Sequence, residues 1–363
     1  MKPALRDDAT TARRSCYPCD MQVRTGHTEE EGAVYVSSAG SRDLEATVKL
    51  AKAPTKKSRA TCFKLKVDGL RGGHSGVNIH EDRQNAIKLL AQTLSALQSA
   101  TDLELVSIEG GNKRNAIPRY AEAEFIVHPD SIELLRQTHA TYTARLKEMY
   151  KESEPNLQIS LAEDGIRNNT FPPSDTKTII NLLQAIPSGV LQMSPAIPDL
   201  VQTSNNLGVV TSQEDGVKII CMLRSNVDQE LLSLTHRVIS IFSLVSPLSI
   251  SEKLFTTNEQ KVTNDQIVLE FSQVSPGWKA QSDNELVEYF QESHQEITGE
   301  KAEVKAIHAG LECGVILSYL PTAKCISFGP EIRDAHSPVE KLKISSVEPF
   351  YKIFLHLVQK LAK

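Results

Sequence analysis

The sequence lacks an apolar run of the roughly 18 residues that a membrane-spanning helix requires. Its longest apolar stretch, residues 238–245, is broken by serines, so we expect no membrane partner. A basic surplus is also missing: 40 Lys and Arg stand against 45 Asp and Glu, which argues against nucleic acid as a partner. The first residues have no hydrophobic core, and acidic residues at positions 7, 8 and 20 disfavour an organelle transit peptide. We therefore expect a cytoplasmic protein.

Cysteine is scarce and spread along the chain. Six cysteines in 363 residues form no disulfide framework and are typical of reduced cytosolic thiols. Cys16 and Cys19 form a CxxC pair, but no second Cys or His pair follows at zinc-finger spacing. This part of the chain is therefore expected to be an unstructured tail rather than a zinc or redox motif.

Apolar residues make up 40% of the chain, enough for two domains with their own cores. Two patterns predict secondary structure clearly. Residues 61–70 alternate Phe63, Leu65 and Val67 with lysines, as in a half-buried strand. Residues 83–98 carry apolar side chains at helical spacing, so we expect a helix there.

The order of such patterns predicts two α+β units in series. In the first, a strand at 61–70 and a helix at 83–98 precede strands at 103–111 and 120–129 and a helix at 132–152. In the second, a strand at 156–164 and a helix at 176–187 precede a strand pair within 206–225 and a helix at 228–245. This order suggests an internal duplication, although no residue-level repeat is visible. The last part has α/β character, with helices at 285–298 and 344–363 and strands within 302–310 and 323–330.

Three polar residues stand at the edges of these elements. His74, in GLRGGHSG (69–76), lies between glycines directly after a strand, so its ring is expected at a loop, or alternatively in a polar turn. Asn115, in GNKRNAIPR (111–119), precedes an Ile-Pro step and can donate and accept hydrogen bonds at a turn. Arg224, in CMLRS (221–225), ends an apolar strand, and its planar fork suits a carboxylate.

Two glycine-hinged loops follow apolar strands near the C-terminus. They are HAGLECG (308–314) and ISFGPEIRDAHSPVE (326–340), and such loops commonly carry sites in α/β sheets. His336 lies in a polar stretch where packing does not require a histidine, which favours a ligand or catalytic role. Upstream, GHTEEEGAVYV (26–36) sets His27 and three glutamates ahead of a strand, as either a metal site with its own base or a solvated turn.

Taken in order and at their separations, GLRGGHSG, GNKRNAIPR, NLGVV…CMLRS, IHAGLECG and GP…HSP resemble the M20 metallopeptidase family. The resemblance covers residues 29 to 363. Within the family, the motifs most resemble the cytosolic aminoacyl-histidine (Xaa-His) dipeptidase branch. It implies a hydrolase of the metallopeptidase and dipeptidase type that cleaves Xaa-His and other small dipeptides with two zinc ions. It also implies a homodimer formed through the lid domain.

The fold implied by the resemblance is α/β, a zinc aminopeptidase-like catalytic domain with an inserted two-lobed α+β lid. Residues 1–28 are expected to be a non-family or disordered N-terminus, and 29–60 a remnant of the catalytic domain. The lid is expected over 61–260, with halves at about 61–155 and 156–260. Residues 261–363 are then the C-terminal part of a catalytic domain whose N-terminal part is missing.

The resemblance assigns roles only where its motifs stand. His74 matches the lid histidine that stabilises the oxyanion of the tetrahedral intermediate. Asn115 and Arg224 match positions that grip the substrate, the arginine taking the C-terminal carboxylate. Gly310 and Glu312 match the loop that lines the site beside the metals. His336 matches a histidine that holds one zinc ion.

The remaining ligands of the family lie upstream of the matching region. They are a His-x-Asp stretch, a bridging aspartate and a Glu-Glu pair that supplies the general base, and residues 1–28 contain no His-x-Asp. His27 stands where the family has a metal-binding aspartate, and the glutamates after it are similar to a solvated acidic turn. Besides a dipeptidase, two alternatives follow: a non-catalytic, dimerising, peptide-binding remnant, or a fragment from an incomplete gene model.

Overall fold

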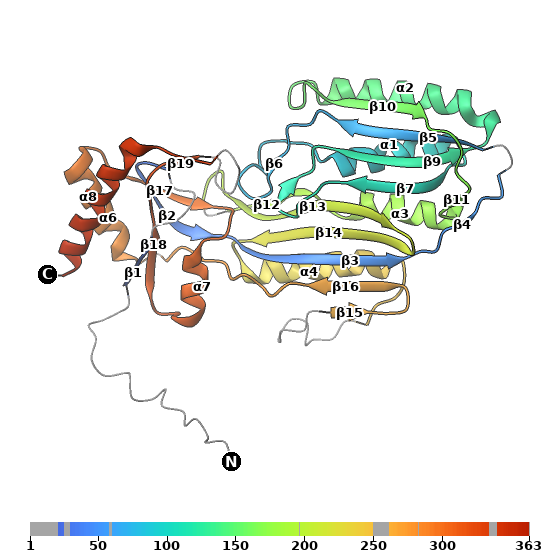
Figure 1. Ribbon diagram of the computed structural model, residues 1–363. Helices are drawn as coiled ribbons and strands as arrows, with labels where there is room; N and C mark the ends of the chain where they lie inside the picture. Colours follow the sequence, from blue (N-terminus) through green and yellow to red (C-terminus); the bar gives the residue numbers. More distant parts are fainter. Residues whose placement is uncertain are drawn as a thin grey trace, which may run out of the picture. The chain divides into compact units, whose positions relative to one another are not determined.

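The computed structural model describes residues 21–24, 30–57, 60–195, 197–249, 261–281, 283–333 and 340–362. The chain divides into two compact units (Figure 1). The sheet unit comprises Ala39–Gly277 and Ile307–Gly310. The C-terminal unit comprises Met1–Ser38, Trp278–Ala306 and Leu311–Lys363. Each unit is described by itself below.

One long antiparallel sheet forms the sheet unit. Its strand order is β10-β5-β9-β7-β13-β14-β3-β16-β15, with β12 paired to β13. The two predicted halves meet where β7 pairs with β13, through Gly110 opposite Val210 and Glu109 opposite Thr211. The strands are β3 Gly40–Lys49, β5 Thr61–Asp68, β7 Glu104–Gly110, β9 Ala121–Val127, β10 Gln158–Glu163, β12 Gly189–Met193, β13 Val201–Gln213, β14 Gly216–Ser225, β15 Lys261–Thr263 and β16 Ile267–Phe271.

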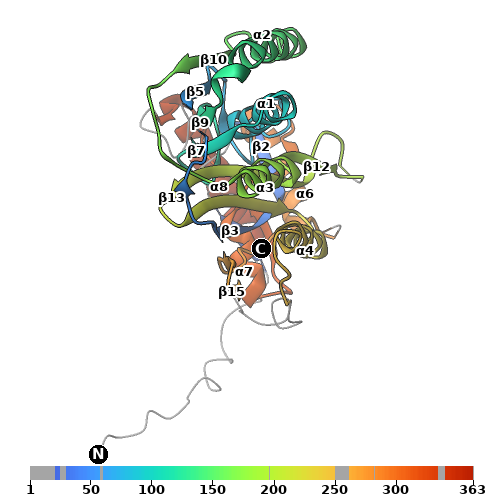
Figure 2. The same ribbon diagram turned by 90° about the vertical axis from the view of Figure 1, so that its right-hand side faces the viewer.

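Four helices cover one face of this sheet (Figure 2). They are α1 Ala86–Ala100, α2 Ile132–Met149, α3 Pro173–Ala185 and α4 Asp228–Ser243. Asn85 starts α1 because its side chain accepts from the backbone N–H groups of Ile87 and Lys88. Along β3 the buried residues alternate, with Leu44, Ala46 and Val48 facing the helices in one continuous core. Among the described residues of this unit, no helix lies on the opposite face of the sheet (Figure 2), which carries polar side chains such as Asp43 and Glu45.

These elements confirm the strands and helices predicted for residues 61–245, with ends within a few residues. The unit also takes in β3 and β16, which lie outside the predicted lid span of 61–260. β3 pairs with β14 along ten residues, from Gly40 opposite Ser225 to Lys49 opposite Gly216. Two short pairs complete the unit: β4 Ala53–Pro54 with β11 Asn169–Thr170, and β6 Gly73–His74 with β8 Ala116–Ile117.

The C-terminal unit contains a small mixed sheet of order β1-β18-β2-β17. Its strands are β1 Met21–Arg24, β2 Ala33–Ser38, β17 Glu303–Ile307 and β18 Lys324–Ser327. Its helices are α6 Glu285–Thr298, α7 Glu312–Tyr319 and α8 Ile344–Leu361. Phe290, Phe328 and Leu357 are central to its core. β19 Ile332–Arg333 pairs with β20 Lys341–Leu342.

The predicted strands and helices of the last hundred residues are confirmed. β1 pairs in parallel with β18, so the described part of the expected N-terminal tail forms a strand. The CxxC pair at Cys16 and Cys19 lies outside the described residues. No helix among the described residues is long and apolar enough to cross a bilayer.

Candidate functional site

His74 is held by a glycine turn on the sheet unit. Gly72 and Gly73 have φ of 61° and 144°, and a Cβ on Gly72 would lie 2.1 Å from the Arg119 side chain, so only glycine fits there. The imidazole Nδ1 accepts hydrogen bonds from the backbone N–H groups of Gly76 at 3.2 Å and Val77 at 3.1 Å. An accepting Nδ1 places the ring proton on Nε2, so His74 presents Nε2 as a donor.

Asn115 lies beside this turn. β6 pairs with β8, which sets His74 opposite Ala116, and the Ser75 N–H donates to the Asn115 carbonyl at 2.9 Å. Asn206, on β13, donates through Nδ2 to the carbonyls of Arg114 at 2.9 Å and of Ala116 at 2.8 Å. The loop before β8 is therefore clamped to β13, with the half-buried Asn115 next to His74.

Arg224 is the second-to-last residue of β14 and is 4% exposed. Its Nη2 lies 3.3 Å from the Met222 sulfur, which also contacts the Ser75 hydroxyl at 3.9 Å, so Arg224 joins the group of His74 and Asn115. Its Nε has no hydrogen-bond partner among the described residues. Burial lowers the pKa of Arg224 to about 10 and nearby Asp43 opposes this, so the side chain is still a cation at neutral pH. A buried guanidinium with an unpaired N–H is expected to bind an acidic group such as a carboxylate.

His308 is a buried neighbour of Arg224 that the sequence did not single out. Its Nδ1 lies 3.1 Å from the Asn226 side-chain oxygen, and its Nε2 lies 2.7 Å from the Ser204 hydroxyl. Because an amide oxygen only accepts, Nδ1 carries the proton and Nε2 accepts from Ser204. Burial and the charge of Arg224 lower the pKa of His308 to about 3, so the ring is neutral. The Ala39 N–H donates to Ala309 O at 3.0 Å, which fixes the segment ahead of the exposed Gly310.

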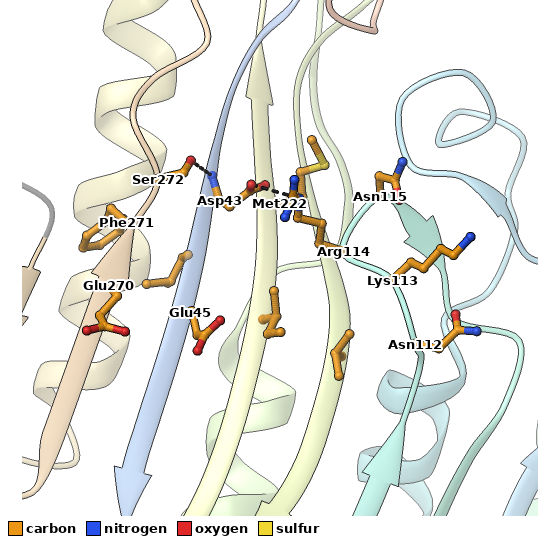
Figure 3. Close-up of a pocket in the computed structure, with 13 residues that line it drawn as sticks. Asp43, Glu45, Asn112, Lys113, Arg114, Asn115, Met222, Glu270, Phe271 and Ser272 are labelled. Atoms are coloured by element: carbon orange, nitrogen blue, oxygen red, sulfur yellow. Dashed lines mark hydrogen bonds and ion pairs between the residues drawn. The ribbon is translucent and has the colours of Figure 1, made fainter. Parts of the chain in front are cut away.

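A cleft of about 660 Å³ opens on the uncovered face of the same sheet (Figure 3). It is lined by residues of β3, β13, β14 and β16 and by the loop that carries Asn115. Met222 lines it too, so the cleft begins one side chain away from Arg224. Across its upper end Arg114 Nε forms an ion pair with Asp43 at 2.9 Å. A volume of this size suits a small ligand.

The remaining predicted residues are not placed with this group. Glu312 begins α7 and belongs to the C-terminal unit, whereas His74, Asn115, Arg224 and Gly310 belong to the sheet unit. His27 and His336 lie outside the described residues. Within the described ranges, no three His, Cys, Asp or Glu residues come together as metal ligands.

Sequence reasoning passed over His308, Met222 and Asp43. His308 stood within a quoted motif, but a histidine in an apolar strand is as typical of a core as of a site. Met222 stood within the quoted CMLRS motif only as an apolar strand residue, and Asp43 gave no signal, because the importance of both comes from strand pairing between distant segments.

This chain is similar to known proteins in both sequence and structure. A family model described as the M20 peptidase dimerisation domain matches residues 60–154. The cytosol non-specific dipeptidase of Escherichia coli strain K12 is 32% identical over 344 residues, which cover 94% of this chain and 66% of that protein. The solved aminoacylhistidine dipeptidase of Vibrio alginolyticus aligns with a TM-score of 0.81 at 32% identity, covering 94% of this chain and 65% of that one. The chain thus spans just under two thirds of the length of these relatives.

Proposed function

The chain belongs to the M20 peptidase family, and we propose that it supplies the lid and the C-terminal part of a dipeptidase that hydrolyses Xaa-His and other small dipeptides. One observation carries the proposal. His74, Asn115 and the buried Arg224 come together in the sheet unit, and Arg224 Nε has no partner among the described residues. The α/β fold expected from the sequence is confirmed by the similarity to the Vibrio enzyme.

Each of the three residues has a distinct role in this proposal. Arg224 binds the C-terminal carboxylate of the dipeptide, because a planar guanidinium can donate two parallel hydrogen bonds. Asn115, on the clamped loop, binds the peptide backbone through its amide. His74 donates from Nε2 to the oxygen that becomes negative when the scissile carbonyl is attacked, and its Nδ1 is held by two backbone N–H groups. For Gly310 and Glu312 the role of lining the site stays an expectation from their sequence motif.

The complete site is proposed to use two zinc ions, which supply an activated water when bound. His336 is the proposed imidazole ligand, with His27 at the position of a family aspartate. Two imidazoles without a bridging carboxylate do not make a two-metal centre, and within the described residues no three His, Cys, Asp or Glu residues gather as metal ligands. The described residues therefore do not fit such a centre, and no step of the proposal passes through a metal.

The partners follow from the same premise. The match of residues 60–154 to a dimerisation domain supports a homodimer formed through the lid. The name of the Escherichia coli relative supports a cytoplasmic location and dipeptides as substrates. Sedimentation of the purified chain tests the first point, and a mass of one chain would contradict it.

A second candidate function has a specific observation in its favour. The residues proposed to bind the peptide lie together in the sheet unit, and binding alone needs no metal. This combination would also suit a protein that binds peptides without hydrolysing them.

One experiment separates the two functions. Zinc content, binding of glycyl-L-histidine and its hydrolysis are measured on the 363-residue chain and on Arg224→Ala. Turnover by a chain that holds two zinc ions supports the dipeptidase, provided that Arg224→Ala loses this turnover. Binding without turnover or zinc supports the second function, and neither binding nor turnover contradicts both.

A further inference from the structure

Asp43 is a charged neighbour of Arg224 that no role above includes. On the antiparallel pair of β3 and β14, Asp43 stands opposite Met222, and Ser41 stands opposite Arg224. Asp43 and Arg224 therefore project from the same face of the sheet as diagonal neighbours, roughly 7–8 Å apart at their backbones. A side chain as long as arginine spans much of that distance.

Asp43 is also tied to the loop that carries Asn115. Its Oδ2 accepts from Arg114 Nε at 2.9 Å, across the upper end of the cleft (Figure 3). Arg114 is the residue directly before Asn115, and its carbonyl is held by Asn206. The loop is thus fixed through its backbone by β13 and through the Arg114 side chain by β3.

The two charges are close but not directly paired. Asp43 Oδ1 and Arg224 Nε are both buried atoms without a hydrogen-bond partner among the described residues. Burial raises the pKa of Asp43, and the charges of Arg114 and Arg224 oppose this rise. Burial lowers the pKa of Arg224, and the charge of Asp43 opposes this lowering. Asp43 therefore offsets part of the cost of burying a cation without occupying its donors.

The backbone of Asp43 is fixed as well. Its N–H donates to the Ser272 hydroxyl at 2.9 Å, and its carbonyl accepts from the Ser272 N–H at 3.0 Å. The Asp43 carboxylate thus stands on a rigid part of the sheet. A small displacement of β3 would change its distance to both Arg114 and Arg224.

We propose that Asp43 is a positioning and selectivity residue of the peptide site. Through Arg114 it holds Asn115 at a fixed distance from Arg224. Through its own charge it reduces the preference of Arg224 for a free carboxylate over a neutral C-terminal group. This inference rests on the proposed binding of peptides by Arg224, and it predicts that the two effects can be separated by substitution.

The test measures binding of glycyl-L-histidine and of its C-terminal amide to the full chain by calorimetry, with a chelator present so that the peptide is not consumed. Asp43→Asn removes the ion pair and the negative charge of Asp43, whereas Arg114→Gln removes the ion pair and the Arg114 cation but keeps the negative charge of Asp43. We expect Arg114→Gln to bind each ligand about tenfold more weakly, and Asp43→Asn to bind the amide about tenfold more weakly, because the Asn115 loop is less well positioned. Only Asp43→Asn is expected to raise the acid-to-amide affinity ratio, roughly threefold or more, because the opposing charge is gone.

The control is Glu124→Gln on β9. Glu124 accepts from Arg167 Nε at 3.2 Å, a matched carboxylate–arginine pair four strands from β3, and its loss should leave both affinities unchanged. If Asp43→Asn fails to fold, Arg114→Gln still tests the loop effect, since the Arg114 side chain is 62% exposed.

A failure of the Asp43 role can be told apart from a failure of the proposed peptide binding by Arg224. A wild-type chain that does not prefer the acid over the amide contradicts the role of Arg224 itself. A wild-type chain that prefers the acid, together with an Asp43→Asn variant of unchanged affinity and ratio, overturns the inference alone. An equal change of the ratio in Arg114→Gln overturns the separate effect of the Asp43 charge.

Discussion

Replacing Arg224 by methionine should stabilise the protein and strongly weaken peptide binding. Burial lowers the pKa of Arg224 to about 10. Because one pKa unit is worth about 1.36 kcal/mol, the distance from the ordinary arginine value corresponds to about 3 kcal/mol of unfavourable folding free energy. The folded pKa lies below the unfolded one, so this cost is fully present at neutral pH and is relieved only as the pH rises above about 10.

Methionine fills similar apolar space without a charge. Asp43 loses a favourable neighbour in the variant but keeps its ion pair with Arg114. We therefore expect a net gain of about 1–3 kcal/mol in the free energy of unfolding, the usual result of replacing a buried charge by an apolar side chain. Loss of the carboxylate contact should weaken glycyl-L-histidine binding by about a hundredfold, or about 3 kcal/mol.

Urea denaturation and calorimetry measure the two quantities, and Arg42→Met is the matched control. Arg42 is 5% exposed, but its Nε donates to Ser272 O at 3.4 Å and its guanidinium lies 4.6 Å from the centre of the Phe271 ring. Its replacement should therefore destabilise the fold by about 1–3 kcal/mol. Arg224→Met with an equal loss of stability, or with peptide affinity retained, would refute the reasoning.

Three further predictions test the local geometry. Nitrogen NMR should show His74 as the Nε2–H tautomer at neutral pH, since Nδ1 accepts two backbone hydrogen bonds, and an Nδ1–H signal would contradict its assigned role. Gly111→Ala should lose about 3 kcal/mol or more in urea denaturation, because φ is 65° and a Cβ would lie 1.9 Å from Gly208 O. Gly299→Ala, at φ 84° with nothing within 4 Å, should lose only about 1 kcal/mol, and equal losses would count against the steric argument. Limited trypsin digestion should leave a resistant fragment close to Ala39–Gly277, and early cleavage after Lys218, inside β14, would contradict a rigid sheet.

Local patterns predicted the elements of the sheet unit well. The apolar spacing over 83–98 became α1, whose exact start depends on the Asn85 cap, and the alternation over 61–70 became β5. Each of these signals lies within one short window of sequence. They do not depend on which other strand lies alongside.

Short windows of sequence did not predict which strands lie next to each other in the sheet. The sequence assigned residues 29–60 to a remnant of the catalytic domain, whereas β3 lies between β14 and β16 in the long sheet. That placement depends on pairing with residues far along the chain, and it is what brings Asp43 next to Arg224. His74, Asn115 and Arg224 were found through motifs, but their contact through Ser75 and Met222 required the fold.

The position of β3 between β14 and β16 also has a consequence for synthesis. Its first partner, β14, is encoded roughly 170 residues later, which at ribosomal rates is a delay of roughly 8–35 s. During that time the apolar side of β3, with Leu44, Ala46 and Val48, has no strand of its own sheet beside it. The helices and strands of the first half can form early, because their contacts are local, while closure of the sheet waits for β14 and then for β16. The nascent chain should therefore need chaperone protection until about residue 271 has left the ribosome.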